Sequence, residues 1–439
     1  MWQTIVNAFK IKEVRRKILI TVALLFVYRL GCYIPVPGIT ILGFEGINDF
    51  TFLQIMSGVS GGALQYGTLF AMGIGPYINA SIIIQLLTVG IPALERLSKQ
   101  GEEGRRRINV YTRILTLFLA IAQSIGILIA FSGSIKTEYI FNSGTNPSQF
   151  LEYLSYIFLV VVYTAGAAFT MWIGERITDY GVSNGISMLI FAGILSTAGT
   201  SLLNTFKELG NPATAQGATW ALVGFIIAAV LIFAAIVTVE NAERKIPVQY
   251  AKQVKGRKMY GGQSTHIPIK VNSSGVMPLI FAFAILSFPD LIMNLFGLRA
   301  GNGFYDFWMT WFGTGGWVYT PLLCLLILFF SYFYNQIQFN PEDISKSIQS
   351  NGGFIPGTRP GKPTTDYLKK VSNRITLFGA IYLAIVALVP SLVFKAIGGQ
   401  TLVNVFSATG LLIVVSVALE FDQALTSQIM MKNYKGFLK

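Results

Sequence analysis

The chain has 439 residues, of which 53% are hydrophobic and only 12% are charged. A soluble domain carries about a quarter of its residues as charged side chains, so this composition excludes an ordinary set of soluble domains. The mean hydropathy of +0.59 favours a polytopic membrane protein instead. Yet 33 Lys and Arg outnumber 20 Asp and Glu and leave a net charge of +13, whose location along the chain needs an explanation.

The first apolar run begins at residue 18 and follows five basic residues. No small-residue cleavage site follows it, so we expect a retained first span and not a removed signal peptide. The two cysteines, Cys32 and Cys324, lie far apart inside apolar runs. This spacing predicts neither a disulfide framework nor a metal site.

Ten stretches are long and apolar enough, or nearly so, to cross a bilayer as helices. Such a helix needs about 20 mostly apolar residues, because a rise of about 1.5 Å per residue must cover about 30 Å of hydrocarbon. The predicted spans are 18–34, 68–91, 114–131, 151–174, 182–203, 218–239, 276–298, 317–339, 375–394 and 402–419. Five spans followed by five place the second half in inverted orientation, a pattern known among membrane conduits. The halves would be 1–210 and 211–426, followed by a tail at 427–439.

The basic residues fall almost entirely in alternate loops between these spans. The loops on one side, with both termini, hold 28 of the 33 Lys and Arg. The positive-inside rule therefore predicts that both termini are cytosolic. The asymmetry also supports the number of spans, since one helix too many or too few would mix basic and non-basic loops.

Two cytosolic loops, 240–271 and 340–374, are too long and too basic to be simple connections. Contact with anionic lipid explains short basic flanks, at about 1 kcal/mol per basic residue near the surface. It explains a loop of roughly 30 residues poorly. These two loops therefore predict a docking surface for a macromolecular partner.

Sequence motifs for enzyme chemistry are weak. Residues 357–363 contain a Gly-Lys pair followed by Pro, which lacks the Ser or Thr of a phosphate-binding loop. Residues 58–62 and 181–185 both match G-x-S-x-G, and the first resembles the serine motif of rhomboid proteases. Such a serine needs a base, and the only histidine, His266, lies in a basic cytosolic loop. Small-residue packing or a flexible turn explains both matches better than a nucleophile.

An ion-coupled transporter is the second alternative. Transporters of this kind usually place paired ionisable residues at mid-membrane, and this chain hardly does so. Span 68–91 instead carries Asn79, Ser81 and Gln85, and span 182–203 begins with Ser183 and Asn184. These side chains form ordinary interhelical hydrogen bonds or face an aqueous path. The Gly-rich segment 57–67, too short to cross, could be a loop, a re-entrant element or a stopper.

A series of distinctive motifs runs along the chain. The strongest are SGGAL at 60–64 and GPYINASIIIQLL at 75–87. Further landmarks occur in order: IPVPG at 34–38, EEGRRR at 102–107, QSIGI at 123–127, GIS at 185–187, YAK at 250–252, QSTHIP at 263–268 and FIPGTRPG at 354–361. Together these motifs closely resemble the SecY/Sec61-alpha family of protein-conducting channels, and the resemblance covers nearly the whole chain. It implies an all-α polytopic membrane protein with ten transmembrane helices in two inverted five-helix halves around a central pore.

The resemblance also implies a narrow apolar ring in the pore. The matching positions are all isoleucine: Ile74, Ile78, Ile186, Ile190, Ile280 and Ile413. A narrow apolar collar dewets and blocks ions, yet it can widen around a passing chain without binding it. Ile74 with Ile78, and Ile186 with Ile190, are four residues apart and would share a helix face.

The same resemblance assigns a plug, a lateral gate and a docking surface. The plug would be 57–67, with Ser57, Gly58, Ser60, Gly61, Gly62, Ala63, Leu64 and Tyr66. Many relatives carry a basic plug residue where this chain has Gln65 and Tyr66. The electrostatic interactions of the plug in those relatives are therefore not expected in this chain. Spans two and three opposite seven and eight would form the gate, and Gln85 and Asn184 match polar positions near it. The residues that match partner-binding positions are Arg244, Arg257, Lys258 and Arg359.

We therefore expect a channel subunit without enzyme activity or cofactor that moves unfolded polypeptides across the bacterial cytoplasmic membrane and releases apolar segments sideways into lipid. The expected partners are SecE-like and SecG-like membrane subunits, a SecA-like ATPase, the ribosome, signal-sequence-bearing polypeptides and anionic lipid on the cytosolic side. A motor is expected because no nucleotide site is visible in the sequence. A solute transporter and a rhomboid-like protease remain the alternatives, and both leave the long basic loops unexplained.

Overall fold

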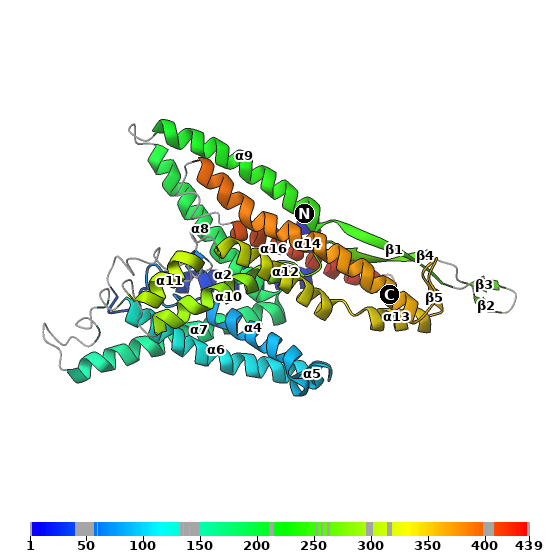
Figure 1. Cartoon of the computed structure of the whole chain (residues 1–439), viewed down its shortest axis with the longest axis horizontal. Helices are drawn as coiled ribbons and strands as arrows, with labels where there is room; N and C mark the ends of the chain where they lie inside the picture. Colours follow the sequence, from blue (N-terminus) through cyan, green and yellow to red (C-terminus); the bar gives the residue numbers. More distant parts are fainter. Residues whose placement is uncertain are drawn as a thin grey trace. The chain divides into compact units, whose positions relative to one another are not determined.

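The computed structural model describes residues 2–39, 57–58, 60–131, 135, 140, 149–209, 215–250, 253–255, 258–260, 264–295, 302–313, 318–397 and 408–436 (Figure 1). Each of the ten predicted spans overlaps a helix, although residues 69–74 form turns and 402–407 lie outside the described residues. These helices are α2 (Lys12–Gly31), α4 (Gly75–Gly90), α6 (Glu102–Ala130), α7 (Gln149–Tyr180), α8 (Gly185–Leu209), α9 (Ala215–Glu240), α10 (Met277–Leu295), α12 (Tyr319–Gln338), α14 (Lys362–Ile397) and α16 (Ala408–Gly436).

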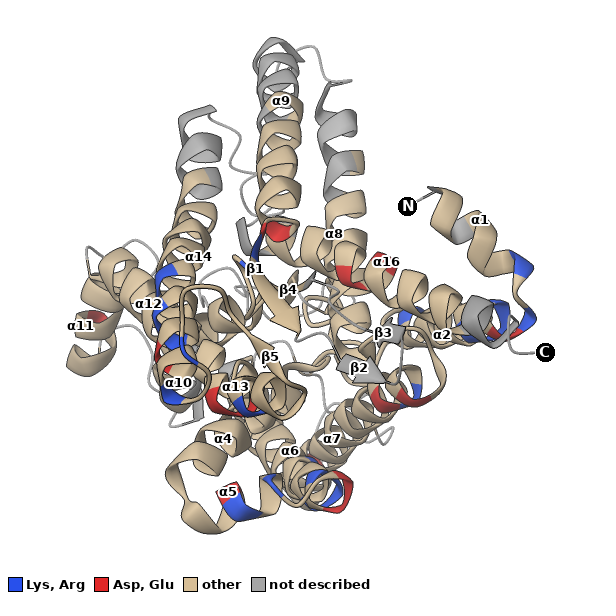
Figure 2. Ribbon diagram, turned by 90° about the vertical axis from the view of Figure 1, so that its right-hand side faces the viewer, with Lys and Arg blue, Asp and Glu red and all other residues tan. Residues whose placement is uncertain are grey.

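Five helices of the described chain are long and apolar enough to cross a membrane, judged by length and composition. A sixth is added if α4 and α5 (Pro92–Ser98), which meet at a bend of 105°, count as one broken span. α2 falls short because five of its first six residues are charged. In α8, α9 and α10 the described apolar parts are only 10–17 residues long. Figure 2 shows where the charged residues lie on the helices. α12 has none, and the only charged residue of α9 is the glutamate at its end.

Local sequence explains where several helices begin. Proline occupies one of the first two positions of α4, α5 and α13 (Pro341–Ser350), where the missing N–H costs no helical hydrogen bond. Asn340 caps α13 by accepting from Glu342 N at 3.2 Å. Asn302 caps α11 (Gly303–Phe312) in the same way through Phe304 N at 3.3 Å. The remaining short helix, α1 (Trp2–Lys10), precedes α2.

The predicted loop 240–271 contains strands that the sequence analysis did not anticipate. β1 (Glu243–Tyr250) pairs antiparallel with β4 (Ser264–Lys270), from Glu243 opposite Lys270 to Gln249 opposite Ser264. β2 (Gln253–Lys255) and β3 (Lys258–Tyr260) form a second, two-stranded sheet beyond them (Figure 1). β5 (Gly353–Phe354), from the other long loop, pairs with the second edge of β1 and completes the order β4-β1-β5.

The chain divides into two compact units. Unit 1 contains Met1–Pro212, Ala284–Gly316 and Val417–Lys439, and unit 2 contains Ala213–Phe283 and Trp317–Ser416. The largest described core of unit 1 joins α6 and α7 to the segment around Leu64 and Met72. A core of unit 2 lies under the three-stranded sheet and includes Ile246, Val248 and Leu368.

Candidate functional site

The predicted plug is a compact series of turns that its own backbone holds together. Ser60 Oγ donates to Ser57 O at 3.1 Å and accepts from Leu64 N at 3.4 Å. Gly62 N donates to Ser57 O at 2.8 Å. Gly61 and Gly62 have φ values of 71° and 84°, in the left-handed region that favours glycine. The small residues of this segment therefore fold into a series of tight, hydrogen-bonded turns.

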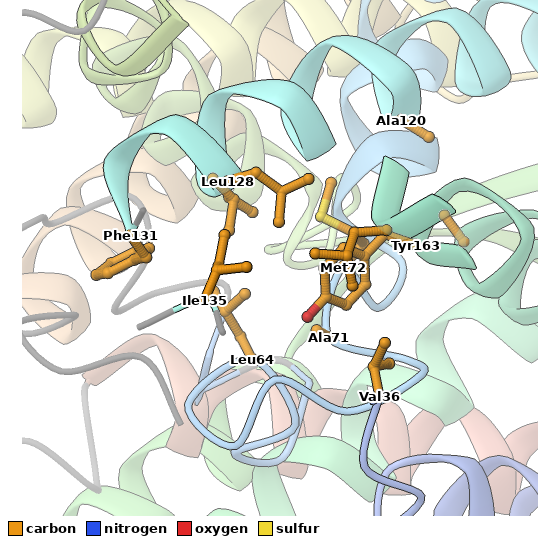
Figure 3. Close-up of a cluster of buried hydrophobic side chains, with 12 residues drawn as sticks. Val36, Leu64, Ala71, Met72, Ala120, Leu128, Phe131, Ile135 and Tyr163 are labelled. Carbon is orange, nitrogen blue, oxygen red and sulfur yellow. The ribbon is translucent and has the colours of Figure 1, made fainter. Parts of the chain in front are cut away.

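One side of this segment is buried in the core of unit 1. Leu64 is fully buried and belongs to the same apolar cluster as Leu128 of α6 and Tyr163 of α7 (Figure 3). Tyr163 also donates its hydroxyl hydrogen to Gly67 O at 3.3 Å. Tyr66, by contrast, is 60% exposed. Burying a leucine side chain is worth about 1.5–3 kcal/mol, so Leu64 anchors the segment to α6 and α7.

Polar contacts fasten the segment to α2 and α8 as well. Thr197 Oγ1 of α8 donates to Gly58 O at 3.2 Å, and Cys32 Sγ donates to Ser60 O at 3.7 Å. Arg29 of α2 donates to Ser196 Oγ of α8. Its guanidinium also lies so close to Gly61 that a Cβ atom there would overlap it. Ser57, Gly58 and Gly62 are half-buried between these contacts.

The predicted ring isoleucines occupy four helices and an N-cap position. Ile74 caps α4 and Ile78 lies one turn later, with Ile78 N donating to Ile74 O at 3.0 Å. Ile186 and Ile190 lie one turn apart near the start of α8. Ile280 lies on α10 and Ile413 on α16, both in unit 2. Ile74, Ile190 and Ile413 are buried, and Ile78, Ile186 and Ile280 are half-buried.

The two predicted gate residues make local hydrogen bonds. Gln85 Nε2 of α4 donates to Ser81 Oγ at 3.0 Å, and Asn184 Oδ1 accepts from Ile186 N at 3.0 Å at the start of α8. Gln123 of α6 begins the QSIGI landmark but was assigned no site role from the sequence, and it is 2% exposed. Among the described residues, neither its amide nitrogen nor its oxygen has a hydrogen-bond partner. The available signal was the polar pair Gln123-Ser124 inside the apolar C-terminal half of α6, residues 117–130.

The two long basic loops meet in one folded body, which we call the platform: residues 243–250, 264–270 and 341–375. Gln249 of β1 is opposite Phe354 of β5, and Tyr250 is opposite Gly353. Beneath the sheet, Ile246 and Val248 pack with Ile348 of α13 and Leu368 of α14. Each loop was predicted to be a docking surface, and their pairing makes them a single surface.

The predicted partner-binding residues lie on or beyond the platform. Arg244 of β1 and Arg359 are exposed. The turn that carries Arg359 is held by Thr364 Oγ1, which donates to Arg359 O at 2.8 Å, and by Ser345 Oγ, which donates to Gly361 O at 3.0 Å. Lys258 begins β3, and Arg257 lies outside the described residues.

The two residues behind the enzyme alternative, Ser60 and His266, belong to different compact units. Ser60 Oγ is engaged with backbone atoms of its own segment in unit 1. His266 is an exposed residue of β4 in unit 2. Within the described part of the chain, no three His, Cys, Asp or Glu residues gather as a metal site would require.

Comparison with known proteins decides the family. The SecY family model matches residues 68–421. The protein translocase subunit SecY of Streptomyces scabiei is 41% identical over 445 residues, with 99% of each chain covered. That of Thermus thermophilus is 40% identical and covers 98% of this chain and 96% of its own. The chain belongs to the SecY family.

Solved structures share the fold of this SecY-family chain. A protein-conducting channel matches with a TM-score of 0.65 over 94% of this chain and 92% of its own, at 19% identity. Canine Sec61 from a ribosome–channel complex matches with a TM-score of 0.62 over the same shares, at 18% identity. The channel fold implied by the motifs is confirmed.

Proposed function

We propose that this chain is the protein-conducting subunit of a translocase in the bacterial cytoplasmic membrane. It passes unfolded polypeptides outward and releases hydrophobic segments sideways into the bilayer. The observation that carries the proposal is the seating of segment 57–67 against α2, α6, α7 and α8 in a chain of the SecY family. Such a plug seals a resting channel and is displaced when a polypeptide enters.

The pore narrows at the six isoleucines, contributed by the two halves 1–210 and 211–426. Their side chains are apolar, branched and of equal size, so they form a constriction that excludes water and ions when empty. They offer no hydrogen bond to a passing backbone, so a chain slides through without being held. The pairs on α4 and α8 lie one helical turn apart, which supports a collar about two side chains deep.

The lateral gate lies between spans two and three on one side and seven and eight on the other. Gln85 and Asn184 lie near it, and an apolar segment leaves the pore through it because the segment partitions into lipid. Selectivity then follows from hydrophobicity and needs no dedicated binding pocket. This step involves no covalent chemistry.

Energy comes from partners that dock on the platform. A ribosome pushes the nascent chain, or a SecA-like ATPase drives a completed one, and SecE-like and SecG-like subunits complete the membrane complex. Solved relatives include a ribosome-bound canine Sec61 channel and the yeast Ssh1 complex bound to the 80S ribosome. The exposed Arg244 and Arg359 suit the phosphates of ribosomal RNA or acidic protein surfaces. Both termini are cytosolic, together with 28 of the 33 basic residues.

The test is to widen the collar and measure both ions and polypeptide. Ile78→Gly with Ile190→Gly should raise the resting ion conductance in planar bilayers several-fold, because the dry constriction is lost. A signal-sequence-bearing polypeptide should cross the membrane of proteoliposomes made with the wild-type chain and supplied with its membrane partner subunits and a motor. Each glycine also costs about 1 kcal/mol of helix stability, so Val89→Gly with Leu195→Gly, at exposed sites of the same helices, is the matched control. Equal conductance of the two double variants would contradict the collar, and no transport by the wild type would contradict the function.

A further inference from the structure

A hydrogen-bonded cluster joins the platform to α16 within unit 2. Glu240 is the last residue of α9 and lies just before β1. Its Oε1 atom accepts two hydrogen bonds, one from Asn272 Nδ2 at 2.7 Å and one from Ser416 Oγ at 2.9 Å. Hydrogen bonds to a carboxylate are about twice as strong as bonds between neutral groups. One side chain therefore links three segments that are distant in the sequence.

The bond to Asn272 closes the root of the β1–β4 hairpin. Asn272 follows β4 by two residues, and it is 4% exposed. Beside it, Val271 N donates to Ala242 O at 3.0 Å. α14 packs so closely here that a Cβ atom at Gly379 would overlap Val271 O. The base of the hairpin is therefore fixed to α9 and α14, and a force on the hairpin reaches Glu240.

The bond to Ser416 reaches the helix that carries a predicted collar residue. Ser416 lies three residues after Ile413 on α16, so the two side chains are close on the helix surface. The neighbouring residues Leu412, Ile413 and Val415 are 0%, 6% and 1% exposed. Tight packing around them means that a shift of Ser416 moves Ile413 as well.

We propose that Glu240 is a positioning residue that couples partner docking on the platform to the collar position Ile413. This inference rests on the proposed function, because it takes the platform as the docking surface and Ile413 as part of the collar. Glu240 is half-buried, and breaking either hydrogen bond would remove a charge-assisted contact of its carboxylate, so the two bonds make the hairpin root and α16 move together. A partner that displaces the hairpin thereby displaces Ile413.

The test measures ribosome binding and channel opening separately. Ribosomes carrying a stalled signal-sequence chain are added to the full-length chain in planar bilayers, and the increase in ion conductance is measured. Binding of the same ribosomes to proteoliposomes is measured by cosedimentation. We expect the variants Ser416→Ala and Glu240→Ala to bind ribosomes as the wild type does. Their ribosome-induced increase in conductance should be about tenfold smaller, because a tenfold change corresponds to the free energy of one lost hydrogen bond to a charged group. Glu240→Gln keeps a carbonyl acceptor and should retain most of the increase.

Two comparisons make the outcome decisive. Ser331→Ala also removes a buried serine of unit 2, but among the described residues its Oγ bonds only to Ile327 O one turn earlier in α12, so this variant should behave as the wild type. The double variant Glu240→Ala with Ser416→Ala should be no worse than Glu240→Ala alone. Equal conductance increases for Ser416→Ala and Ser331→Ala, or additive losses in the double variant, would overturn the inference. Absence of any response in the wild type would instead contradict the proposed function.

Discussion

At the residue scale, the geometry of the plug requires glycine at position 61 but not at position 58. Gly61 has a φ of 71°, and Arg29 occupies the space where its Cβ atom would lie. Gly58, three residues earlier, has no atom within 4 Å of the corresponding position and no left-handed backbone. Both glycines belong to the same G-x-S-x-G match, yet only Gly61 is required by the geometry.

We predict that Gly61→Ala loosens the plug and raises the resting ion conductance. A left-handed alanine costs about 1–2 kcal/mol, and the methyl group must also displace the guanidinium of Arg29. The measurement is conductance of the chain alone in planar bilayers, with no partner added. Gly58→Ala is the control and should remain as tight as the wild type. Equal ion conductance in Gly61→Ala and Gly58→Ala would show that the close contact between Gly61 and Arg29 does not hold the plug in place.

At the element scale, the platform turns two basic loops into one surface. β5 and β1 lie about 100 residues apart in the sequence, and their pairing brings the Arg244 strand beside the turn that carries Arg359. The core below them contains Ile246, Val248 and Leu368, all buried. Because Arg244 and Arg359 are exposed and the core of the platform is well packed, either arginine can be substituted without unfolding the platform.

We predict that Arg359→Glu weakens partner-driven polypeptide transport without unfolding the platform. The side chain is exposed, and only its backbone oxygen accepts the bond from Thr364. Reversal of the charge should therefore slow transport most at low salt, where screening is weakest. The measurement is the transport rate in proteoliposomes at two salt concentrations, with hydrogen exchange of β1 as the folding check. Arg359→Lys keeps the charge and should lose less. Normal rates for Arg359→Glu would refute a role for Arg359 in docking.

At the scale of the whole molecule, charge asymmetry predicts orientation. The net charge of +13 arises because 28 of the 33 basic residues lie on the predicted cytosolic side. α13 belongs to the platform and so to the predicted cytosolic side, whereas α11 lies between the seventh and eighth predicted spans and so is predicted to be on the opposite side. These two helices offer exposed reporter sites, one for each side.

We predict opposite labelling of the two helices. In a chain with Cys32 and Cys324 replaced, Lys346→Cys in α13 and Phe304→Cys in α11 provide single exposed thiols. A membrane-impermeant maleimide should label position 346 in inside-out vesicles only and position 304 in right-side-out vesicles only. Detergent-opened vesicles, in which both must react, are the control. The reverse pattern would invert the topology.

The helices were predictable because each depends on a local property. A run of about 20 apolar residues specifies a membrane helix wherever the rest of the chain lies. The strands were missed for the opposite reason. Residues 243–250 and 264–270 show no regular alternation of charged and apolar side chains, and each contains a proline. Only pairing across the hairpin and with β5 makes them a sheet. Gly61 and Gln85 were recognised from motifs, but Arg29, Thr197 and Glu240 carried no motif of their own.

The sequence by itself determined which segments form apolar helices, which loops are basic and which family the motifs belong to. These features depend only on residues close together in the chain, because hydropathy, charge and the proline and asparagine residues at helix starts are local properties. Only the tertiary structure decided that Leu64 anchors the predicted plug to α6 and α7, that two distant loops share a sheet, and that Glu240 bonds both Asn272 and Ser416. Such contacts depend on burial and hydrogen bonding between residues far apart in the chain, which no local pattern specifies.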